Sequence, residues 1–198
     1  MLAVEQWDLD ELSRAWGAAQ PFPYVLVDNV VDPATLARLR EAASTEPHWP
    51  NRGEIYDFMA SGETVMHPTL LELEAELGSA RVLDAVRAIS GREISGANLR
   101  SYVYQPGSYL LPHADSRKDV GRVVAYVLYV WIDACVGGEL ELFACEMNGD
   151  DVVHARSAHV IAPRANRLVL FDVTNASLHQ VREVLAGTRV SLTGWFVA

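Results

Sequence analysis

The sequence has little cysteine, an acidic balance of charge and no long apolar run. Its 198 residues include two cysteines, Cys135 and Cys145, which form neither a disulfide framework nor a metal-binding pair. The formal net charge is −10, with 16 basic against 26 acidic side chains. This balance argues against a general affinity for nucleic acid or for an anionic membrane, because both need a basic face.

Signals for export and for membrane insertion are also missing from the sequence. The first residues lack a basic region followed by an apolar stretch, so we expect no signal peptide. No apolar run is long enough to cross a bilayer, so we expect no membrane partner. The composition therefore favours a protein that acts on a small or neutral partner.

The chain changes character near residue 97. Residues 1–96 mix helical patterns with one short strand, at 22–28, whereas residues 97–198 are a succession of short β-type runs separated by turn residues. Eight or so such runs predict a sandwich or a jelly roll. The run 123–131 is apolar on both faces, so we expect the N-terminal helices to cover it. We predict a supporting extension over 1–96 and a β core over 97–198, within one compact unit.

Helical spacing and end signals predict four helices in the N-terminal part. They cover residues 1–20, 33–43, 68–77 and 79–90. Between them, residues 46–67 are rich in Pro, Gly and polar side chains and read as an irregular segment. Such a segment is either a functional lid or an ordered surface loop.

Three side chains in the β-rich part have the types and spacing of metal ligands. His113 and Asp115 lie two apart at the end of a predicted strand, so both project to the same face. His179, on a later strand, supplies a third ligand. Two imidazoles and one carboxylate on one face leave open positions opposite, as in non-haem Fe(II) oxygenases.

Arg189 lies on an apolar strand, where a buried guanidinium needs an anionic partner. One alternative is a structural ion pair with an acid of the protein, such as Glu183. The other is a pocket that binds a dicarboxylate through two hydrogen bonds, with Ser191 as an additional hydroxyl donor. Trp195 shares this face, either in the pocket or in packing.

The ordered set of motifs resembles the prolyl-4-hydroxylase-type 2-oxoglutarate/Fe(II) dioxygenases over roughly residues 97 to 198. The resemblance is specific because the pieces occur in the same order. They are Tyr104-x-Pro106-Gly107, His113-x-Asp115, the run from Arg122 to Tyr129, Gly137-Gly138-Glu139-Leu140, Leu168 to Phe171, His179-x-Val181, and Gly187-x-Arg189-x-Ser191 followed by Trp195-Phe196.

The resemblance implies an α+β fold with a double-stranded β-helix (jelly-roll) core and N-terminal helices packed on one sheet. It implies Fe(II) held by His113, Asp115 and His179, and 2-oxoglutarate held by Arg189 and Tyr104. Activity would require O2, with ascorbate as a candidate reductant. Fe(II) chemistry favours the reducing cytoplasm.

The expected reaction is hydroxylation of an unactivated aliphatic C–H bond. The substrate is a prolyl or other residue in a protein or peptide, or a free amino acid or natural-product intermediate. The charged run 115–119 adds Arg117 and Lys118 as candidate substrate contacts. A cupin-like metalloenzyme, which usually binds its metal with three His and a Glu, and a non-catalytic jelly-roll binding module are the alternatives.

Overall fold

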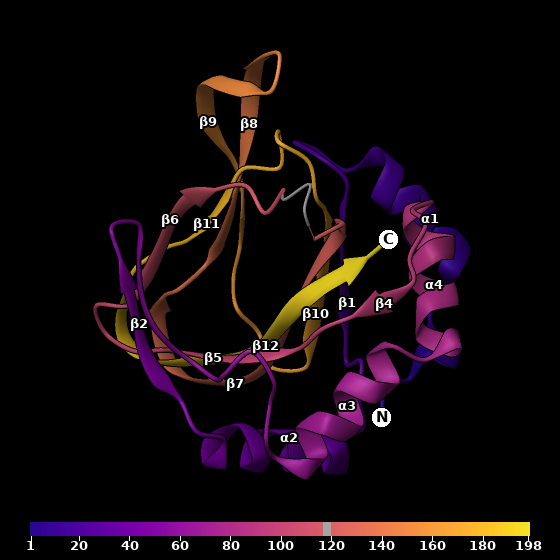
Figure 1. Ribbon diagram of the computed structural model, residues 1–198, viewed down its shortest axis with the longest axis vertical. Helices are drawn as coiled ribbons and strands as arrows, with labels where there is room; N and C mark the ends of the chain where they lie inside the picture. The colour runs from indigo at the N-terminus through magenta and orange to yellow at the C-terminus, as the bar shows by residue number, and fades with distance from the viewer. Residues whose placement is uncertain (117–119) are drawn as a thin grey trace.

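The computed structural model describes residues 1–116 and 120–198, so Arg117 and Lys118 lie outside the described residues. The described elements form an α+β fold in which the helices come early in the chain (Figure 1). The helical elements are η1 (Val4–Gln6), α1 (Leu9–Ala18), α2 (Pro33–Thr45), α3 (Pro68–Leu77) and α4 (Ala80–Ser90).

The helix ends follow from local capping. Asp32 accepts hydrogen bonds from the backbone N–H groups of Ala34 and Thr35, which fixes the start of α2 directly before Pro33. Near the N-terminus, the prediction of one helix over residues 1–20 is wrong. Asp8 caps α1 by accepting from Glu11 N at 2.9 Å, and this cap separates α1 from the short helix η1.

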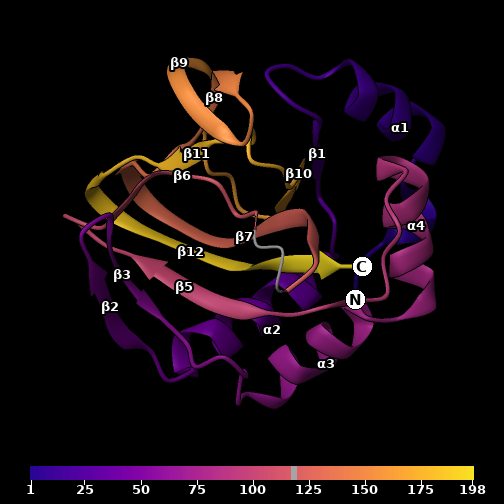
Figure 2. The same cartoon turned by 45° about the horizontal axis from the view of Figure 1, so that its top comes forward.

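The strands form one curled antiparallel sheet, a double-stranded β-helix. Among the described residues it contains 12 strands, in the order β1-β10-β7-β12-β5-β3-β6-β11-β8-β9, with β2 and β4 attached beside this path. Figure 2 shows β5, β12 and β7 as one wall, with β6, β11 and β8 opposite. The strands are β1 (Tyr24–Asp28), β2 (Trp49–Gly53), β3 (Tyr56–Ala60), β4 (Gly96–Ala97), β5 (Arg100–Tyr104), β6 (Tyr109–His113), β7 (Arg122–Gly137), β8 (Leu140–Asn148), β9 (Asp151–Ile161), β10 (Arg167–Asp172), β11 (His179–Val181) and β12 (Val184–Val197).

The helices cover the outer face of the β7/β12 wall, as the sequence predicts. Residues 124–130 of β7 are all buried, which explains why this strand is apolar on both faces. One apolar cluster joins Leu39, Leu73 and Val86 of the helices to Leu128 and Leu192 of the sheet. A second cluster lies on the other face of the wall, inside the curl.

Within residues 46–67, which the sequence predicted to be irregular, residues 49–60 form a hairpin. Strands β2 and β3 pair from Trp49 opposite Ala60 to Gly53 opposite Tyr56. Strand β3 also pairs with β5 and β6, so the hairpin joins the main sheet. The polar composition of β2 fits its position, because it pairs with β3 alone and most of its residues are exposed.

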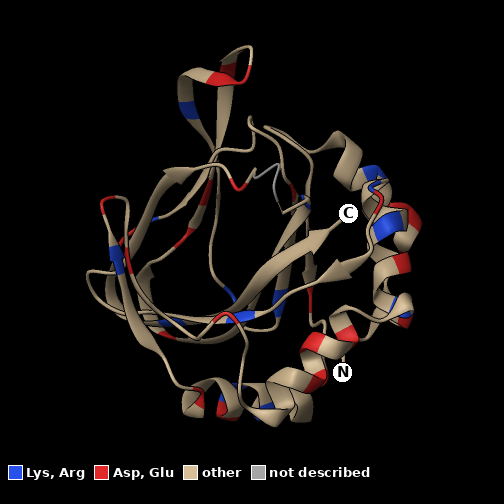
Figure 3. Cartoon of the chain, viewed as in Figure 1, with Lys and Arg blue, Asp and Glu red and all other residues tan. Residues whose placement is uncertain are grey.

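A second hairpin, β8–β9, projects from the body of the molecule (Figure 1). Strand β9 is one continuous strand of 11 residues. Acidic and basic side chains are interspersed along the helices (Figure 3). Of the described helices, none is long and apolar enough to span a membrane.

Candidate metal centre and anion pocket

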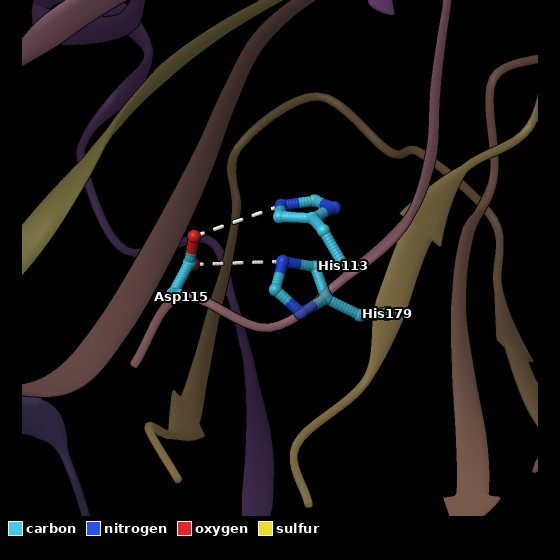
Figure 4. A group of neighbouring side chains, drawn as sticks. All are labelled: His113, Asp115 and His179. Carbon is cyan, nitrogen blue, oxygen red and sulfur yellow. Dashed lines mark ion pairs between the residues drawn. The ribbon is translucent and has the colours of Figure 1, made fainter. Parts of the chain in front are cut away.

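The three predicted metal ligands converge inside the curled sheet. His113 ends β6, Asp115 follows two residues later, and His179 begins β11 directly opposite His113 in the strand register. The Asp115 carboxylate oxygens lie 3.6 Å from His113 Nε2 and 3.5 Å from His179 Nε2 (Figure 4). One ligand atom from each residue lies within 4.8 Å of the other two. Among the described residues, this is the one cluster of three or more possible metal ligands. A cupin-like site of three His and a Glu is therefore not present among them.

Both imidazoles are oriented by the backbone of their own segment. His113 Nδ1 lies 2.9 Å from the carbonyl oxygen of Leu111, and His179 Nδ1 lies 3.0 Å from that of Ser177. Because a carbonyl oxygen only accepts, each Nδ1 carries a hydrogen, which leaves the lone pair of the neutral ring on Nε2. The two lone pairs face the region of the Asp115 carboxylate, which is the tautomer that a metal ion requires.

The electrostatics of the cluster favour binding of a divalent cation. Burial lowers the pKa of His179 to about 4, so this imidazole is neutral near pH 7. Burial alone would raise the pKa of Asp115, but His179 and His113 together hold it well below its usual range. A neutral imidazole and an ionised carboxylate are the forms that bind metal. Two nitrogen donors and one oxygen donor therefore fit Fe(II).

Arg189, on β12, is buried without an anionic partner. Its side chain is 2% exposed, and its Nε and Nη1 atoms are buried with no hydrogen-bond acceptor. The guanidinium carbon lies 4.7 Å from the ring centre of Tyr104 and 4.9 Å from that of Tyr129. Glu183 is exposed and forms no ion pair with Arg189, so the structural pair considered from the sequence is wrong.

Two tyrosines contact this guanidinium, and the sequence predicted a role for only one of them. Tyr104, on β5, lies directly opposite Arg189 in the strand register and lines the cavity. Its contact with 2-oxoglutarate stays a prediction. Tyr129, on β7, is fully buried, and its hydroxyl has no hydrogen-bond partner. The signal for Tyr129 was a hydroxyl at the end of an otherwise apolar run, but that run was interpreted as packing alone.

A cavity of about 490 Å³ connects the metal cluster to Arg189. Ser191 and Thr193 lie on the same wall, where the Thr193 hydroxyl is 3.3 Å from Ser191 Oγ. Apolar side chains make up most of the remaining surface and include Phe58, Leu110, Val127, Leu140, Phe171 and Val181. The six residues predicted as the site, His113, Asp115, His179, Arg189, Tyr104 and Ser191, all line this cavity.

Comparison with known proteins gives matches of sequence and of fold. Residues 98–197 match the family described as the 2OG-Fe(II) oxygenase superfamily. The chain is 26% identical, over 223 aligned positions, to prolyl 3-hydroxylase OGFOD1 of Xenopus laevis. That alignment covers 98% of this chain and 41% of the relative, so the chain spans about two fifths of the relative's length.

Two solved structures share the fold at low sequence identity. A Pseudomonas putida prolyl-4-hydroxylase has a TM-score of 0.68 and 21% identity, covering 94% of this chain and 98% of that one. A Trichoplax adhaerens prolyl hydroxylase, in complex with a peptide of hypoxia inducible factor, has a TM-score of 0.68 and 16% identity, covering 97% and 93%.

Proposed function

Because the chain belongs to the 2OG-Fe(II) oxygenase superfamily, we propose that it hydroxylates an aliphatic carbon of a prolyl or other residue within a peptide or protein. Its cofactors are Fe(II) and 2-oxoglutarate. The observation that carries the proposal is the cavity that joins an N, N, O metal cluster to a buried guanidinium without a partner.

In this proposal, His113, Asp115 and His179 hold the metal. When bound, Fe(II) and 2-oxoglutarate together activate O2 for transfer of one oxygen atom to a C–H bond, with release of succinate and CO2. The chain itself supplies two imidazole nitrogens fixed by backbone carbonyls and one carboxylate that stays ionised. An intact carboxylate at position 115 favours hydroxylation over halogenation, since related halogenases place chloride at that position.

Arg189 is the anchor that we assign to the distal carboxylate of 2-oxoglutarate. A buried N–H group without an acceptor costs about 1–3 kcal/mol, and two such atoms of Arg189 are in this state. A carboxylate in the cavity supplies both acceptors at once, in the fork geometry that suits arginine. Ser191 adds a hydroxyl on the same wall, and the Tyr104 ring fixes the guanidinium from one side.

The apolar walls of the cavity have two tasks. Phe171 packs edge-on against the His179 ring, with centres 4.7 Å apart, and so fixes the ligand's position. Together with Leu140 and Val181 it lines the space beside the metal cluster and limits access of water to the reacting atoms.

The charges in the cavity favour a residue within a peptide over a free amino acid. A free amino acid carries an ammonium group, and burying it requires a carboxylate partner. Of the described residues that line the cavity, Asp115 is the single carboxylate, and it is assigned to the metal. A residue in a peptide chain has no such ammonium. The peptide bound to the Trichoplax relative and the prolyl 3-hydroxylase name of OGFOD1 support the same choice.

The β2–β3 hairpin forms part of the entrance in this proposal. Its tip residue Ile55 lines the cavity and is 43% exposed. The Ile55 carbonyl accepts a hydrogen bond of 2.7 Å from Leu111 N, on the strand that ends in the metal ligand His113. The position of the hairpin therefore favours a role in contacting the peptide, as in the lid interpretation of residues 46–67.

An anaerobic titration tests the cofactor site. Fe(II) and then 2-oxoglutarate are added to the purified protein while the weak visible charge-transfer band of the chelate is followed. We expect the band in the wild type, its loss in His179→Ala, and its retention in His154→Ala, a matched change at an exposed histidine of β9. Iron binding without the band would contradict the 2-oxoglutarate assignment, and no iron binding would contradict the metal site.

The substrate is tested separately, by succinate release over a panel of peptides and free amino acids. We expect turnover with peptides whose termini are blocked. Turnover with a free amino acid alone would contradict the argument from charge.

A further inference from the structure

Strand β1 is one end of the sheet, and its outer edge is unpaired. It pairs with β10 alone, in a register without a bulge. The Pro23 carbonyl and the Asn29 N–H both bond to the β10 side, so the odd-numbered residues direct their backbone groups to β10. The even-numbered residues, Tyr24, Leu26 and Asp28, therefore direct theirs away from the sheet. Among the described residues, nothing forms a backbone hydrogen bond with these three.

Just beyond β1, the same edge already pairs with an extended segment of the chain itself. The Val30 carbonyl, next in the same alternation, accepts from Ala3 N at 2.8 Å. Leu2 forms an antiparallel bridge with Val31. An open edge usually carries Pro or Lys, because it otherwise pairs with other chains. Strand β1, with the sequence Tyr-Val-Leu-Val-Asp, carries neither, so its edge is open and able to pair.

A groove runs along this open edge, between β1 and the helix α1 beside it (Figure 2). It consists of two cavities, of about 370 and 400 Å³, which share Glu11 and Leu12. Every residue of β1 lines one or the other. On the helix side, Ala15, Ala18 and Ala19 leave room beside the strand because their side chains are short. None of the residues that line this β1–α1 groove lines the metal cavity, so it is a separate site.

The charges of the β1–α1 groove favour a basic partner. Its acids are Asp8, Glu11 and Asp28, and of the described residues that line it none is Lys or Arg. Asp28 is paired with Arg167, and Asp8 caps α1, but the Glu11 carboxylate forms no ion pair within the described part of the chain. The acids lie towards the C-terminal end of β1, whereas the alanines line the other end. The groove is thus acidic at one end and apolar at the other.

We propose that the β1–α1 groove binds an extended segment of a partner protein as an additional antiparallel strand on β1, with apolar side chains against α1 and a basic side chain near Glu11. In this mode of recognition, backbone hydrogen bonds give affinity and alternate side chains give specificity. The inference does not rest on the proposed function, because the groove and the metal cavity share no residue.

The faces of β1 fix which residues of the segment do which task. Val25 and Val27 pack with the helices, whereas Tyr24 and Leu26 pack inside the curl. Residues directly opposite each other in an antiparallel pair have their side chains on the same face. The residues opposite Tyr24, Leu26 and Asp28 therefore exchange backbone hydrogen bonds with β1, and their neighbours in the segment face α1.

The first test uses a peptide with blocked ends and a fluorescein label, Lys-Ser-Val-Ser-Val-Ser-Val, whose anisotropy is followed as the full chain is added. In this probe Lys and Val face α1, and the Ser residues pair with β1. N-methylation of the three Ser amides removes the donors to β1, whereas N-methylation of the three Val amides leaves them in place.

We expect methylation of the Ser amides to weaken binding by about 10-fold or more, since three backbone hydrogen bonds are lost. Methylation of the Val amides should change the affinity by less than about threefold. Equal weakening by both sets overturns the inference. A dissociation constant above about 1 mM for the unmethylated probe also overturns it.

A second test fills the groove from the protein side. Ala15→Trp adds bulk at an exposed position of α1 that lines the groove, and Arg14→Trp makes a matched change at an exposed neighbour that does not. We expect A15W to bind the probe about 10-fold or more weakly, and R14W to match the wild type. Equal affinity of A15W and the wild type overturns the inference. A dimer of the free protein that A15W dissociates also overturns it, because the occupant is then a second copy.

A third test addresses the basic residue. Glu11→Gln removes the charge that lines the groove, and Asp10→Asn removes a charge from the same first turn of α1 without lining it. We expect E11Q to weaken binding of the probe about two- to fivefold, the range of an exposed ion pair, and D10N to leave it unchanged. An equal effect of the two variants overturns the placement of the basic residue, since the acidic charge of the whole chain would then attract the probe.

Discussion

Replacing Arg189 by Met distinguishes a ligand anchor from a structural charge by two independent effects. A guanidinium in a buried ion pair stabilises the fold, and removing one partner of such a pair costs about 3–5 kcal/mol. Arg189 has no such pair, and its Nε and Nη1 lack acceptors. The losses in R189M are two cation–π contacts, of about 0.5–2 kcal/mol each. R189M also removes two buried N–H groups that lack acceptors, which recovers about 1–3 kcal/mol for each and offsets the lost cation–π contacts.

The free energy of unfolding of the ligand-free protein should therefore fall by no more than about 2 kcal/mol in R189M. The affinity for 2-oxoglutarate should fall far more. Losing a buried, charge-assisted contact of about 2–5 kcal/mol raises the dissociation constant for 2-oxoglutarate about 30- to 4,000-fold. The two quantities separate the interpretations because a structural arginine shows the opposite pattern.

Thermal unfolding in the presence of Mn(II), with and without 2-oxoglutarate, measures both effects. At a ligand concentration 100 times the dissociation constant, the wild type gains about 2.7 kcal/mol, or about 5–11 °C for a chain of this size. R189M should gain no more than about 0.9 kcal/mol at the same concentration, because its dissociation constant is at least about 30-fold higher. Arg182→Met is the control, since it breaks an ion pair with Glu141 and should lower stability while keeping the shift with 2-oxoglutarate. A large loss of stability in R189M with an unchanged shift would refute the reasoning.

Three further changes test other parts of the structure. Tyr129→Phe should weaken 2-oxoglutarate binding by about 10- to 150-fold, which is the value of a hydrogen bond to a charged group. The control is Tyr126→Phe, whose lost hydroxyl bonds to a backbone carbonyl, so it should lower stability and leave 2-oxoglutarate binding unchanged. Calorimetric titration with 2-oxoglutarate measures both affinities. Hydrogen bonds from Arg182 lower the pKa of Glu141 to about 2. The stability this carboxylate contributes is therefore present above pH 4.5 and lost as the pH falls towards 2, and Glu141→Gln should flatten that loss in urea unfolding. Gly187→Ala should destabilise by more than about 1 kcal/mol, because φ is +73° and a Cβ would meet the backbone of β7; an unchanged urea midpoint would contradict this.

Two of the metal ligands were predictable from the sequence, because a spacing of two residues at a predicted strand end favours one face. In the structure His113 ends β6 and Asp115 lies just beyond the strand, yet its carboxylate still faces both imidazoles. The pairing of His179 opposite His113 is a long-range fact, so the sequence suggested the third ligand without fixing its place. Arg189 stood out because a charge on an apolar strand needs an explanation.

Other features escaped the sequence for identifiable physical reasons. Tyr129 was hidden in an apolar run, and the missing partner of its hydroxyl is visible only when the neighbouring strands are in place. The hairpin of β2 and β3 was missed because the Pro50 and Gly53 of β2 weaken a strand pattern, and an exposed strand needs no apolar face. Trp195 remained ambiguous because a shared strand face does not decide whether a side chain lines a pocket or packs in the core; the structure places it in the cavity wall.

The insertion of β3 sets a minimum size for any shortened form of this protein. The stretch that matches the superfamily begins at residue 98, yet β5 and β6, which lie within it, are joined in the sheet through β3, at residues 56–60. A polypeptide limited to the matched stretch would have an open seam between the strand that carries Tyr104 and the strand that ends in His113. Unpaired backbone groups along that seam would invite aggregation. The region by which the family is recognised is thus shorter than the smallest piece expected to fold.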